Sequence, residues 1–353
     1  AIKYVMPDVD FNSFVNQLLS INNKYEFQHS IMRNFLELLE KKTTAGVSCS
    51  GIENLDDTAY TFITNHRDIV LDASFLNLCL IRSGFDSTEV AIGNNLLIFD
   101  WIETLVKINK SFIVKRNLPM RQALEAARQL SGYLHFTIRE KKQSLWIAQR
   151  EGRAKDSNDF TQESLLKMMA LEGNGTIVDR LRELNLAPVA ISYEYDPNDY
   201  LKAKEFLLKK NNPDYKKSAH DDLLGMETGI LKYKGRVHFA FVGSINHLLD
   251  KIELQDDRNE TYKAVGNVID NAIHANYRIF PCNYIAYDTY YKVDKFAEKY
   301  TKAEKQAFFD YLGEQLKKVD VEATEDDIQY MMDMMLAMYS NPLRNQLIAK
   351  GEL

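Results

Sequence analysis

A histidine followed closely by two carboxylates is the clearest chemical feature of this sequence. His66 lies in the segment TNHRDIVLD, residues 64–72. A carboxylate that accepts a hydrogen bond from one imidazole nitrogen fixes the tautomer and leaves the other nitrogen free to take a proton, which is the minimum for a general base. Asp68 and Asp72 are both close enough in sequence to fill that role. Taken alone, the pattern is more often a hydrogen-bonded turn histidine.

The sequence offers no obvious covalent nucleophile beside His66. It has no Gly-x-Ser-x-Gly segment and no cysteine-centred motif, which favours direct attack by an acceptor molecule over an enzyme-bound intermediate. His66 and Asp68 could instead belong to a metal site, but no other cluster of ligand residues supports that alternative. The cysteines 49, 79 and 282 have no paired spacing, which suits a reducing compartment and indicates neither a disulfide framework nor a zinc site.

Two further segments place basic residues at the ends of apolar runs. Lys115 and Arg116 follow the run 112–114, and Arg150 and Arg153 follow the run 145–148. Arginine side chains, together with the backbone N–H groups of a glycine-containing turn, can bind a phosphate. Taken alone, the first of these segments is better explained as a charged strand end in solvent, and a polar surface turn explains the second equally well. A fourth segment, residues 186–194, reads as a core strand entered through a proline.

The elements that must position these residues follow an alternating pattern. This predicts an α/β fold with a mostly parallel sheet flanked by helices. A Thr-, Ser- and Gly-rich loop is expected at 43–57. The expected regions are a helical N-terminal arm (1–50), an α/β core (51–245) and a helical C-terminal region (246–353), in which the methionine-rich segment 331–338 is expected to be core. Strands are expected at 60–64, 90–92, 112–114, 145–148, 188–192 and 237–242, and helices near 73–82, 100–109, 120–139 and 163–171.

Charge and hydropathy limit the possible partners. The formal net charge of the 353 residues is -6, which argues against a nucleic-acid partner bound by an overall basic field. The longest apolar runs, at 73–81 and 187–191, are far too short to span a bilayer. The first residues lack the layout of a signal peptide. We therefore expect a cytoplasmic protein that, if it acts on lipids, docks on the inner face of the membrane.

In their order and spacing, the four segments together resemble the glycerolipid acyltransferase superfamily, in particular its glycerol-3-phosphate and 1-acylglycerol-3-phosphate acyltransferase branch. That family has a His-x4-Asp motif, a Phe-Ile-x-Arg strand, a Glu-Gly-x-Arg turn and a Pro-containing strand ending in Tyr-Glu. The resemblance covers roughly residues 51–245. Two departures stand out: the spacing from His66 to Asp72 is one residue longer, and the third motif lacks its intervening residue. The matching segments are His66 to Asp72, Phe112 to Arg116, Glu151 to Arg153 and Pro188 to Glu194.

The resemblance implies an O-acyltransferase with no metal and no cofactor, whose co-substrate is a fatty acyl thioester of acyl carrier protein or coenzyme A. His66 would be the general base, oriented by Asp72 or, failing that, by Asp68. The expected acceptor is glycerol-3-phosphate, with a lysophospholipid or an acyl-amino-acid lipid as alternatives. A non-enzymatic lipid-binding protein on the membrane surface is a further alternative. The candidate substrate-binding residues are Arg67, Lys115, Arg116, Arg150, Glu151, Gly152 and Arg153.

Overall fold

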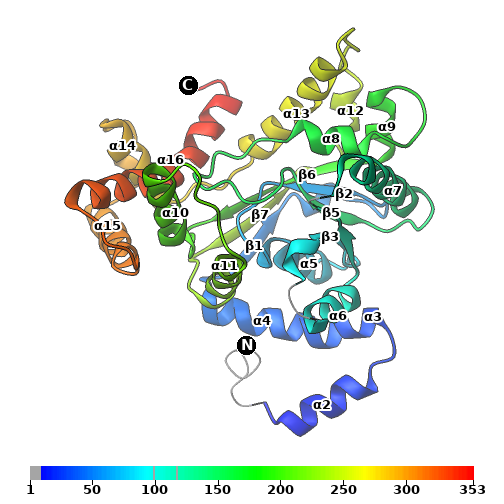
Figure 1. Ribbon diagram of the computed structural model, residues 1–353, viewed down its shortest axis with the longest axis horizontal. Coiled ribbons are helices and arrows are strands. Elements are labelled where there is room, and N and C mark those ends of the chain that lie inside the picture. The colour runs from blue at the N-terminus through cyan, green and yellow to red at the C-terminus, as the bar shows by residue number, and fades with distance from the viewer. Residues whose placement is uncertain (1–8, 98–99, 117) are drawn as a thin grey trace.

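Seven strands form one sheet in the part of the chain that the structure describes, residues 9–97, 100–116 and 118–353 of a computed structural model (Figure 1). Their order is β1-β7-β6-β2-β5-β3-β4. Every pairing is parallel except β6 with β7, so the mostly parallel α/β sheet expected from the sequence is confirmed. The strands are β1 (Val47–Ser50), β2 (Thr61–Thr64), β3 (Glu89–Gly93), β4 (Ser111–Val114), β5 (Leu145–Ala148), β6 (Leu186–Tyr193) and β7 (Val237–Phe241).

All six strands expected from the sequence are present, and a seventh was not expected. The expectation of a continuous loop at 43–57 was wrong, because β1 lies inside it and pairs with β7. Its four residues include two serines, and only one of its edges is paired. A short, polar edge strand of this kind carries little of the apolar signal by which strands are recognised in a sequence.

Alternating side chains along the strands build two separate cores, one on each face of the sheet. Phe62 of β2 and Trp146 of β5 belong to the first core, whereas their neighbours Ile63 and Ile147 belong to the second. This is the period-2 alternation that a strand imposes on its side chains. We call the side that carries Phe62 and Trp146 the first face, and the side that carries Ile63 and Ile147 the second face.

Helices cover both faces (Figure 1). On the first face lie α4 (Arg33–Thr43) and α5 (Leu71–Arg82). On the second face lie α7 (Met120–Arg139), α8 (Glu163–Met169), α9 (Ile177–Glu183) and α13 (Arg258–Ala275). Helix α13 falls in the expected C-terminal region, yet its residues Val265, Ile269 and Ile273 are fully buried in the core of the second face. The core on the second face of the sheet therefore includes a helix that lies beyond residue 245.

The remaining helices form smaller clusters around this centre. A third core contains Phe308, Met331 and Met335, so the methionine-rich segment is core. It joins α10 (Asp199–Asn211), α14 (Pro281–Tyr291), α15 (Lys302–Leu316) and α16 (Glu325–Ala349). The other helices are α2 (Phe11–Ser20), α3 (Lys24–Glu26), a π-helical turn (Phe27–Met32), α6 (Asp100–Ile108), α11 (Ala219–Leu231) and α12 (Asn246–Leu249). Single 3-10 turns occur at Ile52–Asn54, Asn94–Leu96 and Ala297–Lys299.

Candidate active site

His66 lies in the connection between β2 and α5, and its ring is held by the first turn of that helix. Its Nδ1 atom is 2.9 Å from Oδ2 of Asp72. Asp72 is fully buried, and the same oxygen accepts the backbone N–H groups of Arg67 at 2.7 Å and Asp68 at 3.0 Å. Two fixed backbone donors and a helix N-terminus favour the ionised carboxylate. An ionised Asp72 places the proton on Nδ1 and leaves Nε2 of His66 as the free acceptor.

Asp68 has a different task in the same turn. Its Oδ1 accepts the backbone N–H groups of Val70 and Leu71, both at 2.8 Å, so it caps the start of α5 and does not contact the His66 ring. Burial, followed by the charge of Asp72, raises the pKa of Asp68. Helix α5 begins at Leu71, and the longer spacing in the sequence is therefore taken up by the capping turn between the histidine and the helix.

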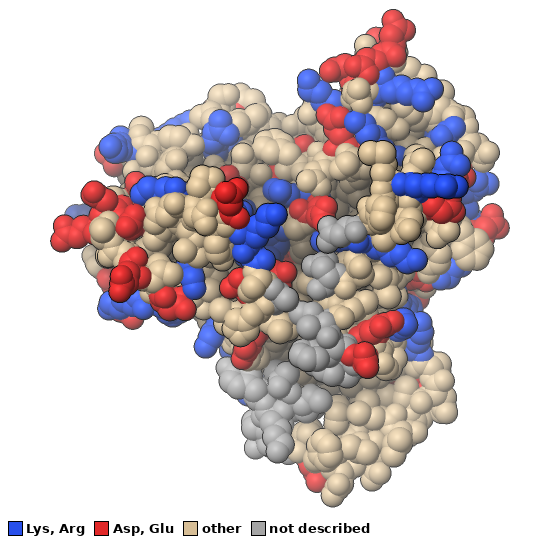
Figure 2. Space-filling model, viewed as in Figure 1, with Lys and Arg blue, Asp and Glu red and all other residues tan. Residues whose placement is uncertain are grey.

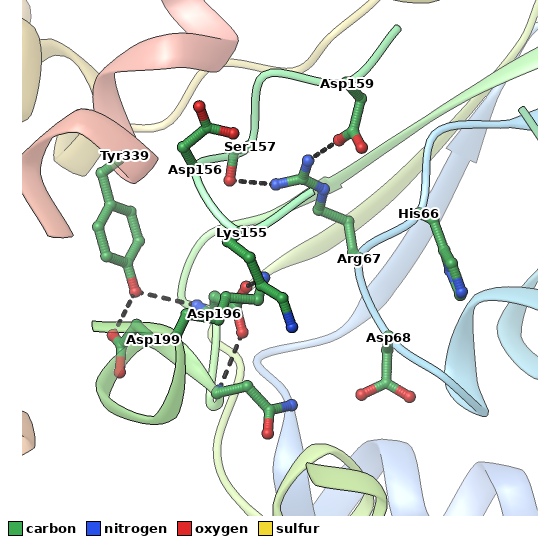
Figure 3. A network of polar contacts seen from close by, with 12 residues as sticks. His66, Arg67, Asp68, Lys155, Asp156, Ser157, Asp159, Asp196, Asp199 and Tyr339 are labelled. Carbon is green, nitrogen blue, oxygen red and sulfur yellow. Dashed lines mark hydrogen bonds and ion pairs between the residues drawn. The ribbon is translucent and has the colours of Figure 1, made fainter. Parts of the chain in front are cut away.

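Arg67 points away from His66 and Asp68 (Figure 3). Its guanidinium is buried and forms an ion pair with Asp159 and a hydrogen bond with Ser157. Burial is the largest single effect and lowers the pKa of Arg67, but the charges of Asp159, Tyr277 and Asp196 and the hydrogen bond to Asp159 together outweigh it, so the net pKa is raised. The side chain thus ties the His66 loop to the segment after β5. We expected Arg67 to bind substrate, and the structure instead engages its guanidinium inside the protein.

A large cavity opens beside His66. Its volume is about 790 Å³, within the range of small-molecule sites. It extends along both faces of β3 and β4, the last two strands at one end of the sheet. On the first face its wall includes Ile92 and Leu78, and on the second face Phe112, Leu130 and Met168. We call these parts the first and second arms of the cavity. Apolar side chains dominate both arms, and His66, Trp146 and Ala148 also line the cavity.

Strand register brings three of the predicted cations to this cavity. Thr64 of β2 pairs with Ala148 of β5, so His66 and Arg150 each lie two residues beyond the ends of neighbouring parallel strands. The carboxyl ends of parallel strands meet at one edge, where α/β folds place their sites. Lys115 and Arg116 follow β4 at the same edge. The side chains of His66, Lys115, Arg116 and Arg150 line the cavity, as does the turn at Glu151 and Gly152. Arg116 Nη1 lies 3.3 Å from Glu151 Oε1.

Arg153 takes a different direction from Arg116 and Arg150. It does not belong to the cavity wall, and only 8% of its surface is exposed. Its guanidinium packs against α11, where a Cβ atom added at Gly225 would lie 3.2 Å from Nη2. Within the described residues, Nη1 of Arg153 has no hydrogen-bond partner. The expected convergence of all the basic residues of the two segments on one pocket is thus found for Lys115, Arg116 and Arg150 but not for Arg153.

Several residues at the site were not singled out as functional from the sequence. The Trp146 ring packs edge-on against His66 with centroids 6.0 Å apart, and alternation along β5 could have indicated that it faces the same side. Met226 of α11 and Ile69 line the cavity. Lys155 is paired with Glu205 at 2.7 Å. Burial, followed by the charge of Lys217, lowers the pKa of Lys155.

Over residues 9–97, 100–116 and 118–353, no three or more His, Cys, Asp or Glu side chains gather in a way that could hold a metal ion. Among the helices of those same ranges, none has the length and apolar character that crossing a bilayer requires.

Comparison with known proteins gives likenesses to solved structures only. No protein-family model matches the chain, and no curated protein matches it either. Among solved structures, the 1-acyl-sn-glycerophosphate acyltransferase PlsC from Thermotoga maritima is similar to 75% of this chain and 88% of its own, with 10% sequence identity and a TM-score of 0.39. A likeness of this extent does not by itself assign the chain to a family or a function.

Proposed function

We propose that this protein is an acyltransferase that moves a fatty acyl group from a thioester of acyl carrier protein or coenzyme A to a hydroxyl group of glycerol-3-phosphate. The observation that carries the proposal is the position of the His66–Asp72 pair. His66 lines the same cavity as Lys115, Arg116 and Arg150, and most of the other side chains in the wall of that cavity are apolar. A base, a place for an alkyl chain and a place for an anion are therefore adjacent.

The chemistry follows from this arrangement. Nε2 of His66 takes the proton of the acceptor hydroxyl while the hydroxyl oxygen attacks the thioester carbonyl carbon. Asp72 stabilises the imidazolium through Nδ1. When the tetrahedral intermediate collapses, the carbon–sulfur bond breaks and the imidazolium returns the proton to the leaving thiolate. No serine or cysteine of the described residues is hydrogen-bonded to His66, whose partner is Asp72, and this supports direct transfer over an acyl-enzyme.

The cations at the strand ends support a phosphorylated acceptor. Charge-assisted hydrogen bonds from arginine to phosphate are strong and directional, so they can orient a hydroxyl beside the base. Lys115, Arg116 and Arg150 line the same cavity as His66. The geometry gives no such support to Arg153 or to Arg67, because neither belongs to the cavity wall. We therefore assign the phosphate to the first three residues.

Exposed apolar side chains support a membrane-surface location. Helix α2 contains no charged residue and exposes Phe11 and Leu19. In Figure 2 the lobe that contains it shows few charged side chains. At the start of α7, Met120 and Leu124 are exposed beside Ala123, which lines the cavity. Apolar residues that reach from the surface to a cavity suit a protein that takes a lipid chain from a bilayer interface.

The test is an acyl-transfer assay with both donors. The protein is incubated with palmitoyl-acyl carrier protein or palmitoyl-coenzyme A and glycerol-3-phosphate, and products are read by mass spectrometry. His66→Ala should lower the rate by about 10²–10⁴-fold, while His247→Ala, an exposed histidine on α12, should leave it unchanged. A fully active His66→Ala protein would falsify the assignment of the base. Binding of lipid without any transfer would favour the non-enzymatic alternative.

A lysophospholipid acceptor is the second candidate, and the shape of the cavity favours it. With apolar arms on both faces of β3 and β4, the cavity can take an acyl chain from the donor and another from the acceptor. Ser74 lines the first arm and Ala127 the second, so Ser74→Phe and Ala127→Phe each narrow one of them. With glycerol-3-phosphate as acceptor, only one of these variants should alter the preference for donor chain length. A lysophospholipid acceptor predicts that the other variant raises the KM of the acceptor alone.

A further inference from the structure

Behind the His66–Asp72 pair, two buried oxygen atoms have no hydrogen-bond partner among the residues that the structure describes. Asp72 uses only Oδ2 for its three hydrogen bonds, and its Oδ1 is buried without one. The hydroxyl of Tyr193, at the end of β6, is likewise buried and unpartnered within the described residues. Buried polar atoms are nearly always hydrogen-bonded, so two that occur together call for an explanation.

Both residues belong to the same side of the sheet. The Tyr193 ring is packed in the core of the first face, where α5 also lies, and Asp72 stands in the first turn of that helix. Burial, followed by the charges of Asp72, Asp68 and Asp196, raises the pKa of Tyr193 well above its usual value. The phenol therefore keeps its proton and can only be a donor toward an ionised carboxylate.

We infer that Tyr193 is a positioning residue for the proposed base, because its hydroxyl donates a hydrogen bond to Oδ1 of Asp72 and so sets how strongly Asp72 holds His66. This inference rests on the proposed function only for its catalytic consequence. The inferred hydrogen bond itself does not depend on that function. Segment 186–194 thus contributes more than the core strand expected from the sequence.

The alternative acceptor for the Tyr193 hydroxyl is Asp68. Its Oδ1 already accepts two backbone N–H groups, and its charge is compensated by Arg153 and faces Lys234. Asp196 is engaged by Lys202 and by the backbone N–H of Asn198. Of these three aspartates, Asp72 is the one whose second carboxylate oxygen is buried without a hydrogen-bond partner in the described structure.

Removing the donor has a predictable direction. A carboxylate that loses one hydrogen bond becomes a stronger acceptor for its remaining partners. In Tyr193→Phe, Asp72 should pull harder on the Nδ1 proton of His66, and the imidazolium should form more readily. Acyl transfer should then fall on the acidic side and recover at alkaline pH. We expect the acid limb of the kcat/KM profile to move up by about 0.5 pH unit, a change of about threefold in proton affinity.

The experiment pairs that profile with a measurement that needs no activity. In protein labelled with ¹⁵N-histidine, the Nδ1 proton of His66 should move downfield in Tyr193→Phe. The control is Tyr277→Phe, which removes another buried, unpartnered hydroxyl that faces Asp159 and Arg67. It should shift neither the signal nor the acid limb. Both single variants keep the aromatic ring in place.

The decisive arm is the Asp72→Asn background. There, Tyr193→Phe should cause no further change in the ring nitrogen signals of His66. An equal change in the His66 signals in both backgrounds would overturn the inference, because Tyr193 would then act through another group such as Asp68. No change in either background would overturn it as well. A downfield shift in a protein that transfers no acyl group to any acceptor would support the hydrogen bond and contradict the proposed function.

Discussion

Gly229 of α11 and Asp68 of the His66 loop fit so closely that no side chain can be added between them. A Cβ atom at Gly229 would lie 1.9 Å from Oδ2 of Asp68. The carboxylate cannot retreat freely, because its other oxygen caps α5 through Val70 and Leu71. Helix α11 therefore braces the loop that carries the proposed base.

Gly229→Ala should consequently destabilise the protein. Overpacking of this kind typically costs about 1–3 kcal/mol, and urea unfolding would measure it. The matched control is Gly313→Ala in the interior of α15, where an added Cβ atom meets no atom within 4 Å. That variant should gain roughly 0.5–1 kcal/mol, since alanine favours a helix over glycine. Equal stability of the two variants would contradict the close fit.

Of the two aspartates in the His66 loop, replacing Asp72 should slow acyl transfer far more than replacing Asp68. Asp72→Asn removes the ionised partner of Nδ1, so the rate of acyl transfer should fall by at least about 10²-fold. Asp68→Asn keeps an oxygen that can cap α5, because asparagine caps a helix about as well as aspartate, and the rate should change little. Steady-state rates of the two isosteric variants measure the difference. A larger loss in Asp68→Asn would reverse the assignment.

Arg116 and Arg153, which follow two different strands, should likewise differ in their effect on the KM for glycerol-3-phosphate. Arg116→Ala should raise the KM for glycerol-3-phosphate by about 10–100-fold, the range expected for a charge-assisted bond, and leave the KM of the thioester nearly unchanged. Arg153 lies outside the cavity wall, so Arg153→Ala should lower the free energy of unfolding and change this KM little. Kinetics with both substrates, together with urea unfolding, would check the pair. A selective effect of Arg153→Ala on the acceptor would restore that residue as a phosphate ligand.

Asp199 should make the stability of the protein fall as the pH rises. Burial, followed by the charge of Asp196, raises the pKa of Asp199 to about 7, so the folded state binds a proton that the unfolded carboxyl group releases near 3.8. Its contribution is largest below pH 4 and is lost between about pH 4 and 7. Relative to Asp199→Asn, the wild type should lose about 1–4 kcal/mol over that window.

Urea unfolding at several pH values measures this difference. The carboxyl group accepts hydrogen bonds from Tyr339 of α16 and Tyr311 of α15, each at 2.8 Å, and Figure 3 shows the first of these contacts. Loosening of these helices should therefore accompany the loss of stability. A pH-independent difference between the wild type and Asp199→Asn would show that the buried carboxyl group does not titrate in this range.

How far the sequence predicts this molecule depends on whether a property is local. The β-type runs predict six strands because each carries its own apolar pattern. The contact between His66 and Asp72 depends on where α5 begins, and the added residue in the motif obscures that start. The directions of Arg67 and Arg153 could not be predicted at all. Each lies in an irregular turn, where no strand or helix period relates a residue to a face.

Because the cavity lies on both sides of β3 and β4, a ligand bound in it should change the stability of the folded protein. At this end of the sheet, the cavity lies beside β3 and β4, whereas packed side chains cover β2 and β6. A bound alkyl chain would supply the missing apolar contacts to β3 and to β4, which pairs only with β3 among the described strands. Any ligand that binds only the folded state adds RT ln(1 + [L]/Kd) to the free energy of unfolding. The substrate would thus act as a removable part of the hydrophobic core, and each turnover would briefly leave this edge of the sheet less supported.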